Sequence, residues 1–291
     1  MASRLENDAQ GAKLAPSPVS AAKELALEFA ADAAAASTAA VLVTPVCAAV
    51  DKAVAESLAG VRPLWDSFFA SLQSMVREPA GLIRRPEMRY VSALFAGTYL
   101  LNNVMVSAEG RARQPMPTTK TATIFAGNLS LAMWKDAAFA RLFGGGAPIV
   151  PPPAFAAWAA RDIVGMTAIF TLPPLVAPRV AEATGISHRS AEALSQFVLP
   201  LAVQPIVAPF HQVGYLLSFK PNAAPSELFA SVRRELSNVV AARWVRIFPP
   251  YCVGATANKD IRMHLRDAFQ LPRHGPGRRM TPGLMRRMTP G

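Results

Sequence analysis

Three pairs of adjacent acidic and basic residues stand at the ends of apolar segments, where their charges could bind a solute or one another: Asp51-Lys52, Lys135-Asp136 and Arg161-Asp162. A charge inside a bilayer is costly, so it is usually paired or faces water. Arginine binds carboxylate or phosphate through a fixed fork of donors, which suits Arg161 and Arg246 to attract an anionic solute. In the alternative interpretation, the neighbours only mark the ends of spans, Arg161 pairs with an acid on another span, and Arg246 fixes the start of a helix.

Enzyme chemistry has no support in the sequence. The four histidines show no metal-ligand spacing, and the glycines at 144–146 are not followed by the GK[ST] of a phosphate-binding loop. The stretch "FAGNLS" has no GxSxG nucleophile elbow. Cys47 and Cys252 have no CxxC partner. We therefore predict a protein that is not an enzyme and uses no cofactor and no metal.

Six apolar segments must position these charges. They cover residues 33–50, 90–108, 121–134, 163–178, 193–219 and 247–258. Each is about the length that crosses a bilayer or somewhat short of it. The chain is 52% hydrophobic and 17% charged, below the ~25% charge of soluble domains. The pattern predicts an all-α membrane protein with six transmembrane helices.

Prolines interrupt several of these segments. Those predicted to kink helices are Pro45, Pro173, Pro174, Pro200, Pro205 and Pro209. A proline inside a water-soluble helix costs about 3 kcal/mol, because a hydrogen bond is lost and the ring clashes with the preceding turn. In a membrane bundle around a polar interior, neighbouring groups and water satisfy the freed backbone. The prolines therefore favour kinked spans that line a cavity.

The order of elements suggests three pseudo-repeats of two helices each, over about 33–110, 117–185 and 187–268. Amphipathic connectors are expected at 63–76 and 225–244, lying in the membrane interface or packing on the core. The predicted domains are an N-terminal extension (1–32) with a short amphipathic helix, a six-helix membrane domain (33–270), and a disordered Arg/Pro/Gly tail (271–291) that carries "RRMTPG" twice.

This pattern resembles the mitochondrial carrier family. "RIFPPYCVGATANKDIR" (246–262) is similar to the start of that family's even helices, where proline follows arginine by three residues, here Arg246 and Pro249. "TTKTATIFAGN" (118–128) and "ARDIVGMTAIFTLPPLVAP" (160–178) resemble, more specifically, a divergent carrier-like branch best populated in fungi. The resemblance implies alternating access in the mitochondrial inner membrane, rather than the outer one.

The resemblance also implies roles for individual residues. By position, the gate residues would be Asp51, Lys52, Lys135, Asp136 and His211. The residues that touch the solute would be Asn102, Asn103, Arg161, Asp162, Thr167, Arg243 and Arg246. The odd-helix hallmark is degraded, since the acid and base expected after Pro45 are replaced by Cys47 and Val50. The gates are thus displaced or absent relative to that family.

Two functions remain open at this stage. The first is a transporter of a small anionic metabolite, in contact with the lipid bilayer and with anionic lipid such as cardiolipin. The second is a transport-inactive fold that serves as a structural or assembly subunit of a large respiratory or ATP synthase complex. Nucleic acid is not expected as a partner, because the arginines behind the net charge of +11 are scattered between apolar segments.

Overall fold

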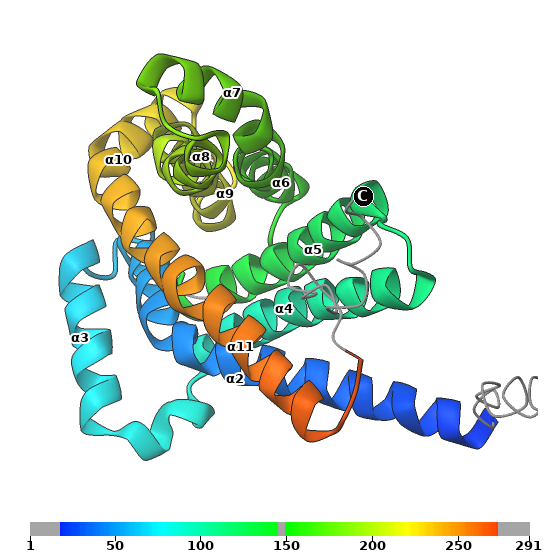
Figure 1. The fold of residues 1–291 in the computed structure, drawn as a ribbon. Helices are drawn as coiled ribbons and strands as arrows, with labels where there is room; N and C mark the ends of the chain where they lie inside the picture. The colour runs from blue at the N-terminus through cyan, green and yellow to red at the C-terminus, as the bar shows by residue number, and fades with distance from the viewer. Residues whose placement is uncertain (1–17, 145–148, 273–291) are drawn as a thin grey trace, which may run out of the picture.

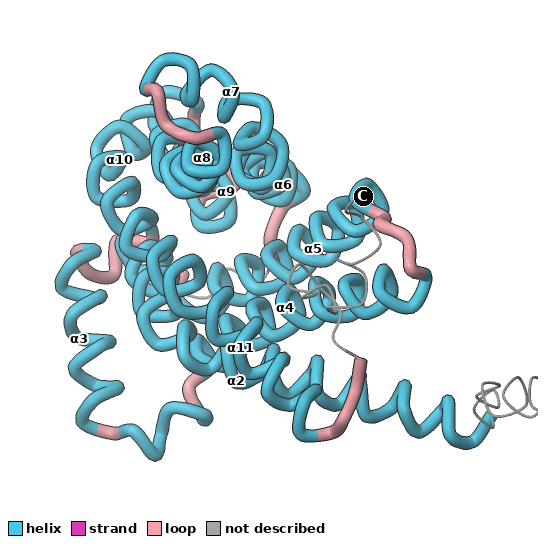
Figure 2. Tube along the Cα trace, viewed as in Figure 1, coloured by secondary structure: helices cyan, strands magenta, loops and turns pink. Residues whose placement is uncertain are grey.

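The computed structural model describes residues 18–144 and 149–272, and these residues form helices without any strand (Figure 2). The residues 1–17 of the predicted extension and 273–291 of the predicted tail lie outside this described part. The all-α class that the apolar segments predicted is therefore confirmed for the described chain.

The helices follow one another with short connections. In chain order they are α2 (Pro18–Leu58), α3 (Leu64–Arg77), the 3-10 turn η1 (Pro79–Arg84), α4 (Pro86–Ala112), α5 (Pro117–Phe143), α6 (Pro152–Met166), the π-helical segment η2 (Thr167–Thr171), α7 (Leu172–Thr184), α8 (His188–Ala202), α9 (Gln204–Phe219), α10 (Pro225–Phe248), the π-helical segment η3 (Pro249–Gly254) and α11 (Ala255–Ala268).

The long helix α2 organises the bundle. It contacts α3, α4, α10 and α11, while α6, α7, α8 and α9 gather in a second group that α10 joins to the first (Figure 1). The buried face of α2 is rich in alanine, including Ala31, Ala35 and Ala39, which lets neighbouring backbones approach closely. Helix α2 also runs unbroken across residues 32 and 33, where the sequence predicted the N-terminal extension to end and the membrane domain to begin.

Four stretches are long and apolar enough to cross a membrane: Ala21–Leu58, Pro86–Ala112, Pro152–Thr184 and His188–Phe219. The predicted segments 121–134 and 247–258 also lie in helices, but α5 and the α10–η3–α11 run do not meet this measure. Both carry several charges, such as Lys135 and Arg246. The chain is thus a helical membrane protein, and the six-span, three-repeat arrangement stays a prediction.

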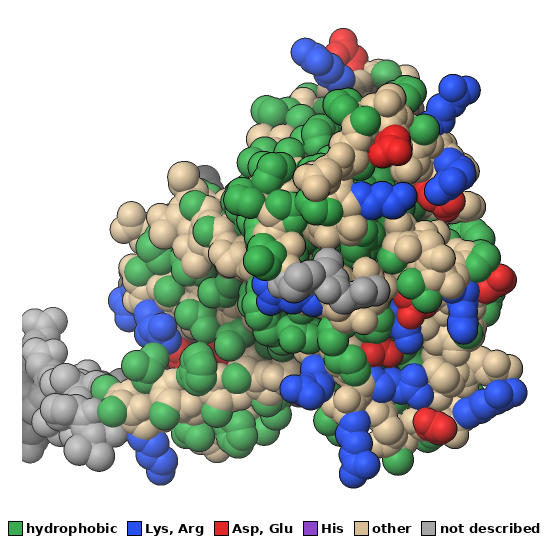
Figure 3. All heavy atoms as spheres, turned by 180° about the vertical axis from the view of Figure 1, so that it is seen from behind, with side chains coloured by type: hydrophobic (Ala, Val, Ile, Leu, Met, Phe, Trp, Pro, Cys, Tyr) green, Lys and Arg blue, Asp and Glu red, His purple; other side chains and the backbone are tan. Residues whose placement is uncertain are grey.

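Large apolar side chains are exposed on the outside of these helices. Val41, Leu175 and Ile206 are each more than half exposed, and Figure 3 shows apolar side chains gathered over the upper half of one face, with Lys and Arg standing out at the rim. Contiguous apolar surface of this kind suits lipid acyl chains.

Of the two predicted connectors, one forms a separate helix and the other is part of a longer helix. Residues 63–76 coincide with α3, which buries Phe68 and Met75 against the core and exposes Phe69 and Val76. The segment 225–244 is not a separate connector, because its helix continues to Phe248 as α10.

Three of these prolines lie beside irregular backbone, and the other three lie inside helices. Pro173 and Pro174 stand in the first turn of α7 directly after η2, and Pro205 stands in the first turn of α9 after a break at Val203. Pro45, Pro200 and Pro209 lie inside α2, α8 and α9.

Other helices satisfy the carbonyl groups that two prolines leave free. A proline has no N–H for the carbonyl four residues earlier. For Pro205 that carbonyl belongs to Leu201, and it accepts a hydrogen bond from Trp244 Nε1 at 3.0 Å. For Pro250 it belongs to Arg246, and it accepts one from Cys47 Sγ at 3.5 Å. These contacts explain how apolar, proline-rich segments remain helical.

The π-helical segment η3 depends on close packing at Gly254. A Cβ at this position would overlap the Tyr99 hydroxyl and lie 2.9 Å from Val43 Cγ1, whereas a Cβ at Gly165 would meet nothing within 4 Å. We predict that Gly254→Ala lowers the melting temperature of the detergent-solubilised protein. Gly165→Ala should hold or raise it, since alanine favours a helix by about 0.5–1 kcal/mol over glycine. Equal melting temperatures for the two variants would contradict this packing.

Candidate functional site

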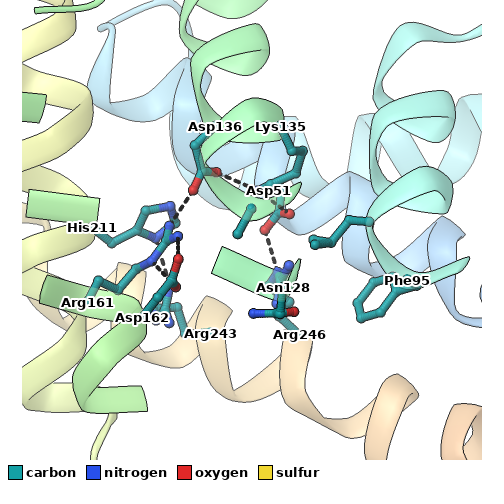
Figure 4. Close-up of a pocket in the computed structure, with 12 residues that line it drawn as sticks. Asp51, Phe95, Asn128, Lys135, Asp136, Arg161, Asp162, His211, Arg243 and Arg246 are labelled. Carbon is teal, nitrogen blue, oxygen red and sulfur yellow. Dashed lines mark hydrogen bonds and ion pairs between the residues drawn. The ribbon is translucent and has the colours of Figure 1, made fainter. Parts of the chain in front are cut away.

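Polar side chains from five helices, charged in four of them, meet around a cavity of about 90 Å³. Its polar lining is Asp51 from α2, Asn128, Lys135 and Asp136 from α5, Arg161 and Asp162 from α6, His211 from α9, and Arg243 and Arg246 from α10 (Figure 4). Leu94, Phe95 and Ala132 complete the lining. Segments far apart in the sequence thus contribute one continuous polar interior.

Asp51 joins two cations from different helices. Its carboxylate lies 2.8 Å from Lys135 Nζ and 2.6 Å from Arg246 Nε. Lys135 Nζ also lies 2.6 Å from Asp136 Oδ1. The Asp51 and Asp136 side chains are 1% and 0% exposed, so both charges depend on these partners.

Asp136 extends the chain of ion pairs to α6. It pairs with Arg161 Nη1 and accepts a hydrogen bond from the Tyr215 hydroxyl at 3.1 Å. Arg161 in turn binds both oxygens of Asp162, through Nε at 2.8 Å and Nη2 at 2.7 Å. Opposite charges therefore alternate along the series Arg246, Asp51, Lys135, Asp136, Arg161 and Asp162.

The cavity lining carries a slight positive excess. Its three carboxylates face four cations, Lys135, Arg161, Arg243 and Arg246, which leaves one positive charge uncompensated. Arg243 Nη1 lies 2.8 Å from His211 Nδ1. A guanidinium can only donate, so Nδ1 accepts and the His211 imidazole is neutral.

Several donors of the lining have no hydrogen-bond or ion-pair partner among residues 18–144 and 149–272. Arg246 uses Nε for Asp51, which leaves Nη1 and Nη2, and its guanidinium lies over the Phe95 ring at 5.6 Å. His211 Nε2 is buried and also without a partner in this part of the chain. The cavity can therefore offer donors to a solute.

Most residues proposed from the sequence meet in this one cavity. Asp51, Lys135, Asp136 and His211 of the expected gate lie together with Arg161, Asp162, Arg243 and Arg246 of the expected solute contacts. The structure brings the two sets together instead of separating them. Arg161 does pair with an acid on another helix, as the alternative interpretation predicted.

The remaining proposed residues lie elsewhere. Lys52 is 3.8 Å from both Glu56 and Glu87. The exposed Thr167 donates to the Ile163 carbonyl of its own helix, and Asn102 is half-buried outside the cavity lining.

Asn103 belongs to a second buried polar cluster, between α2, α4 and α11. Its side chain and that of Asn258 exchange hydrogen bonds of 2.9 Å, and Arg262 Nε binds Asp32 Oδ1 at 2.7 Å. Asp32 precedes Asp51 by 19 positions on α2, which places the clusters about 28 Å apart. This second cluster ties the far ends of three helices together.

Phe95, Asn128 and Tyr215 were missed by sequence reasoning, as was Gln204, whose Oε1 accepts a hydrogen bond from Arg243 Nε at 2.7 Å. Tyr215 follows His211 by four positions and so lies on the same helical face, a signal that was present. Phe95 and Asn128 are an ordinary apolar residue and an ordinary amide within apolar segments, and nothing in their local sequence distinguishes them.

The family model described as "Probable citrulline exporter" matches residues 35–266. The chain belongs to this family. The resemblance to mitochondrial carriers and to their fungal branch was wrong, since prolines and acid–base neighbours within apolar segments are shared by a different family of membrane proteins. Searches of curated proteins and of solved structures found no match.

Membership of the citrulline exporter family assigns the chain to transport. An exporter moves a small solute and is not an enzyme, in agreement with the prediction from the sequence, and the apolar helices supply its contact with the bilayer.

The buried ion pairs give a stability prediction. Asp136→Asn leaves Lys135 and Arg161 without their shared carboxylate, and breaking a buried pair costs about 3–5 kcal/mol. We expect a clearly lower melting temperature in detergent. Glu78→Gln serves as the control, because that side chain is 77% exposed and faces Arg85 at 3.5 Å. Equal melting temperatures for the two variants would show that the cluster does not stabilise the fold.

Proposed function

We propose that this protein exports citrulline, and that the solute binds in the cavity between α2, α5, α6, α9 and α10. The observation that carries the proposal is a cavity that offers both guanidinium donors and carboxylate acceptors within a chain of the citrulline exporter family. Citrulline is a zwitterion with an α-carboxylate, an α-ammonium and an uncharged ureido group.

Arg246 is placed to hold the α-carboxylate. Its Nε is fixed by Asp51 at 2.6 Å, so Nη1 and Nη2 keep a defined orientation. Two parallel N–H donors match the two oxygens of a carboxylate, and such paired, charge-assisted bonds are strong. The Phe95 ring beside the guanidinium limits its movement.

Asp162 is the proposed partner of the α-ammonium. Both of its oxygens accept from Arg161, but each carboxylate oxygen has a further lone pair. Its side chain is 14% exposed, more than those of Asp51 and Asp136. The carboxylates support a zwitterionic solute over the small anionic metabolite predicted from the sequence, because a carboxylate can bind an ammonium group but repels an anion.

We further propose that α5 and the α10–η3–α11 run cross the membrane beside the four apolar stretches, in the predicted arrangement of three helix pairs. Their support is that Lys135, Asp136, Arg243 and Arg246 lie in the same cavity as residues of the apolar helices. Location in the mitochondrial inner membrane, contact with cardiolipin and association with a large respiratory or ATP synthase complex stay predictions.

The test is efflux of labelled citrulline from proteoliposomes that contain the purified protein. Wild-type protein should release citrulline in a saturable manner. Arg246→Lys keeps the charge beside Asp51 but removes the fork, so efflux should fall at least about tenfold, since a hydrogen bond to a charged group contributes about 1.5–3 kcal/mol. Arg77→Lys, at an exposed position on α3, should leave efflux unchanged.

Absence of citrulline efflux from wild-type vesicles would contradict the proposal. Native mass analysis of detergent-extracted membranes would then show whether the chain migrates with a large complex, as the structural alternative requires.

A further inference from the structure

We infer that His211 recognises the ureido carbonyl of the solute through a hydrogen bond from Nε2, and so selects citrulline over amino acids that lack this oxygen. The inference rests on the proposed function and adds the residue that binds the uncharged ureido group of the solute.

The proton of the His211 ring is fixed by its neighbour. Arg243 Nη1 lies 2.8 Å from Nδ1 and can only donate, so Nδ1 accepts and the ring proton lies on Nε2. Arg243 is itself held by Gln204, whose Oε1 accepts from Arg243 Nε at 2.7 Å. Gln204 is anchored by a bond to the Pro200 carbonyl at the break between α8 and α9. His211 Nε2 is therefore a donor that requires an acceptor.

No acceptor for this donor occurs in the described residues. His211 is 2% exposed and lines the cavity, yet its Nε2 has no hydrogen-bond partner in residues 18–144 and 149–272. A buried donor without a partner costs free energy, because the hydrogen bond it made to water is not replaced. Because the ring lines the solute cavity, a solute that brings an acceptor to Nε2 recovers this cost on binding.

The ring is also held in place from the side. Its centroid lies 5.1 Å from that of Tyr215, whose hydroxyl is bonded to Asp136 and whose ring packs on Trp158 at 5.3 Å. A donor on a fixed ring discriminates between solutes better than a donor on a flexible side chain.

The charges around His211 favour an uncharged acceptor over a cation. Arg161 and Arg243 interact with the ring from α6 and α10, together with Asp136 and Lys135 from α5. Asp136, the carboxylate that acts on the ring, is already bound by Lys135 and Arg161, and Asp162 is bound by Arg161 and holds the α-ammonium in the proposed arrangement. The ammonium of ornithine or the guanidinium of arginine would meet cations and would offer only donors. The ureido group of citrulline has nearly the shape of the guanidinium group of arginine, but it is uncharged and offers a carbonyl oxygen as an acceptor.

The test compares solutes and variants in proteoliposomes. Efflux of citrulline is measured beside that of norleucine, which has no ureido group, and thiocitrulline, whose sulfur is a weak acceptor. Wild-type protein should prefer citrulline to both by at least tenfold. His211→Phe, which keeps a flat ring without the donor, should reduce these ratios to within about threefold of unity. His188→Phe, at an exposed position at the start of α8, should keep the wild-type ratios.

The outcomes separate the inference from the proposed function. If His211→Phe exports citrulline with the wild-type ratios, the inference is overturned and the exporter stands. If His211→Phe fails to fold, the wild-type ratios decide, and equal efflux of citrulline and thiocitrulline overturns the inference. If wild-type protein exports no citrulline, the proposed function fails first.

Discussion

A charge buried among apolar helices must meet a charge of opposite sign, and this constraint is strongest at Asp51 and Asp136. Neither carboxylate is more than 1% exposed, and each contacts cations from two positions. Through them α2, α5, α6 and α10 share one chain of ion pairs. Since removing any member leaves a neighbour uncompensated in a low dielectric, the helices are bound to a single mutual arrangement. The cavity exists because the ion pairs hold these helices around it.

The same arrangement explains the irregular backbone. A proline frees a carbonyl, and within a membrane bundle a freed carbonyl needs a donor from a neighbouring helix. Trp244 and Cys47 supply such donors, while Gln204 uses the break before α9 to reach both a carbonyl and Arg243. The π-helical segment η3 directly follows the helix that carries Arg246. Such segments occur often at functional sites, where a local change of pitch re-aims side chains.

The sequence indicates which residues matter more reliably than how they meet. Charged residues such as Lys135 and Arg161 stand out because ionisable groups beside apolar segments are rare and costly, and eight of the twelve positions proposed for gate and solute contacts lie in one cavity. Their partners depend on packing across the bundle, which no local pattern encodes. Nothing in the local sequence distinguished Phe95 and Asn128. The resemblance to mitochondrial carriers was wrong because paired charges and prolines within apolar segments also occur in a different family of membrane proteins.

If this cavity holds the solute, bound citrulline must shield a cysteine placed at position 128 in its lining. The exposed Cys252 is replaced by serine and the buried Cys47 is kept, so that Asn128→Cys supplies the reactive thiol. Citrulline is expected to slow alkylation by N-ethylmaleimide at position 128 but not at a cysteine introduced at the exposed Gln114, between α4 and α5. Equal alkylation rates at position 128 with and without citrulline would contradict binding in this cavity.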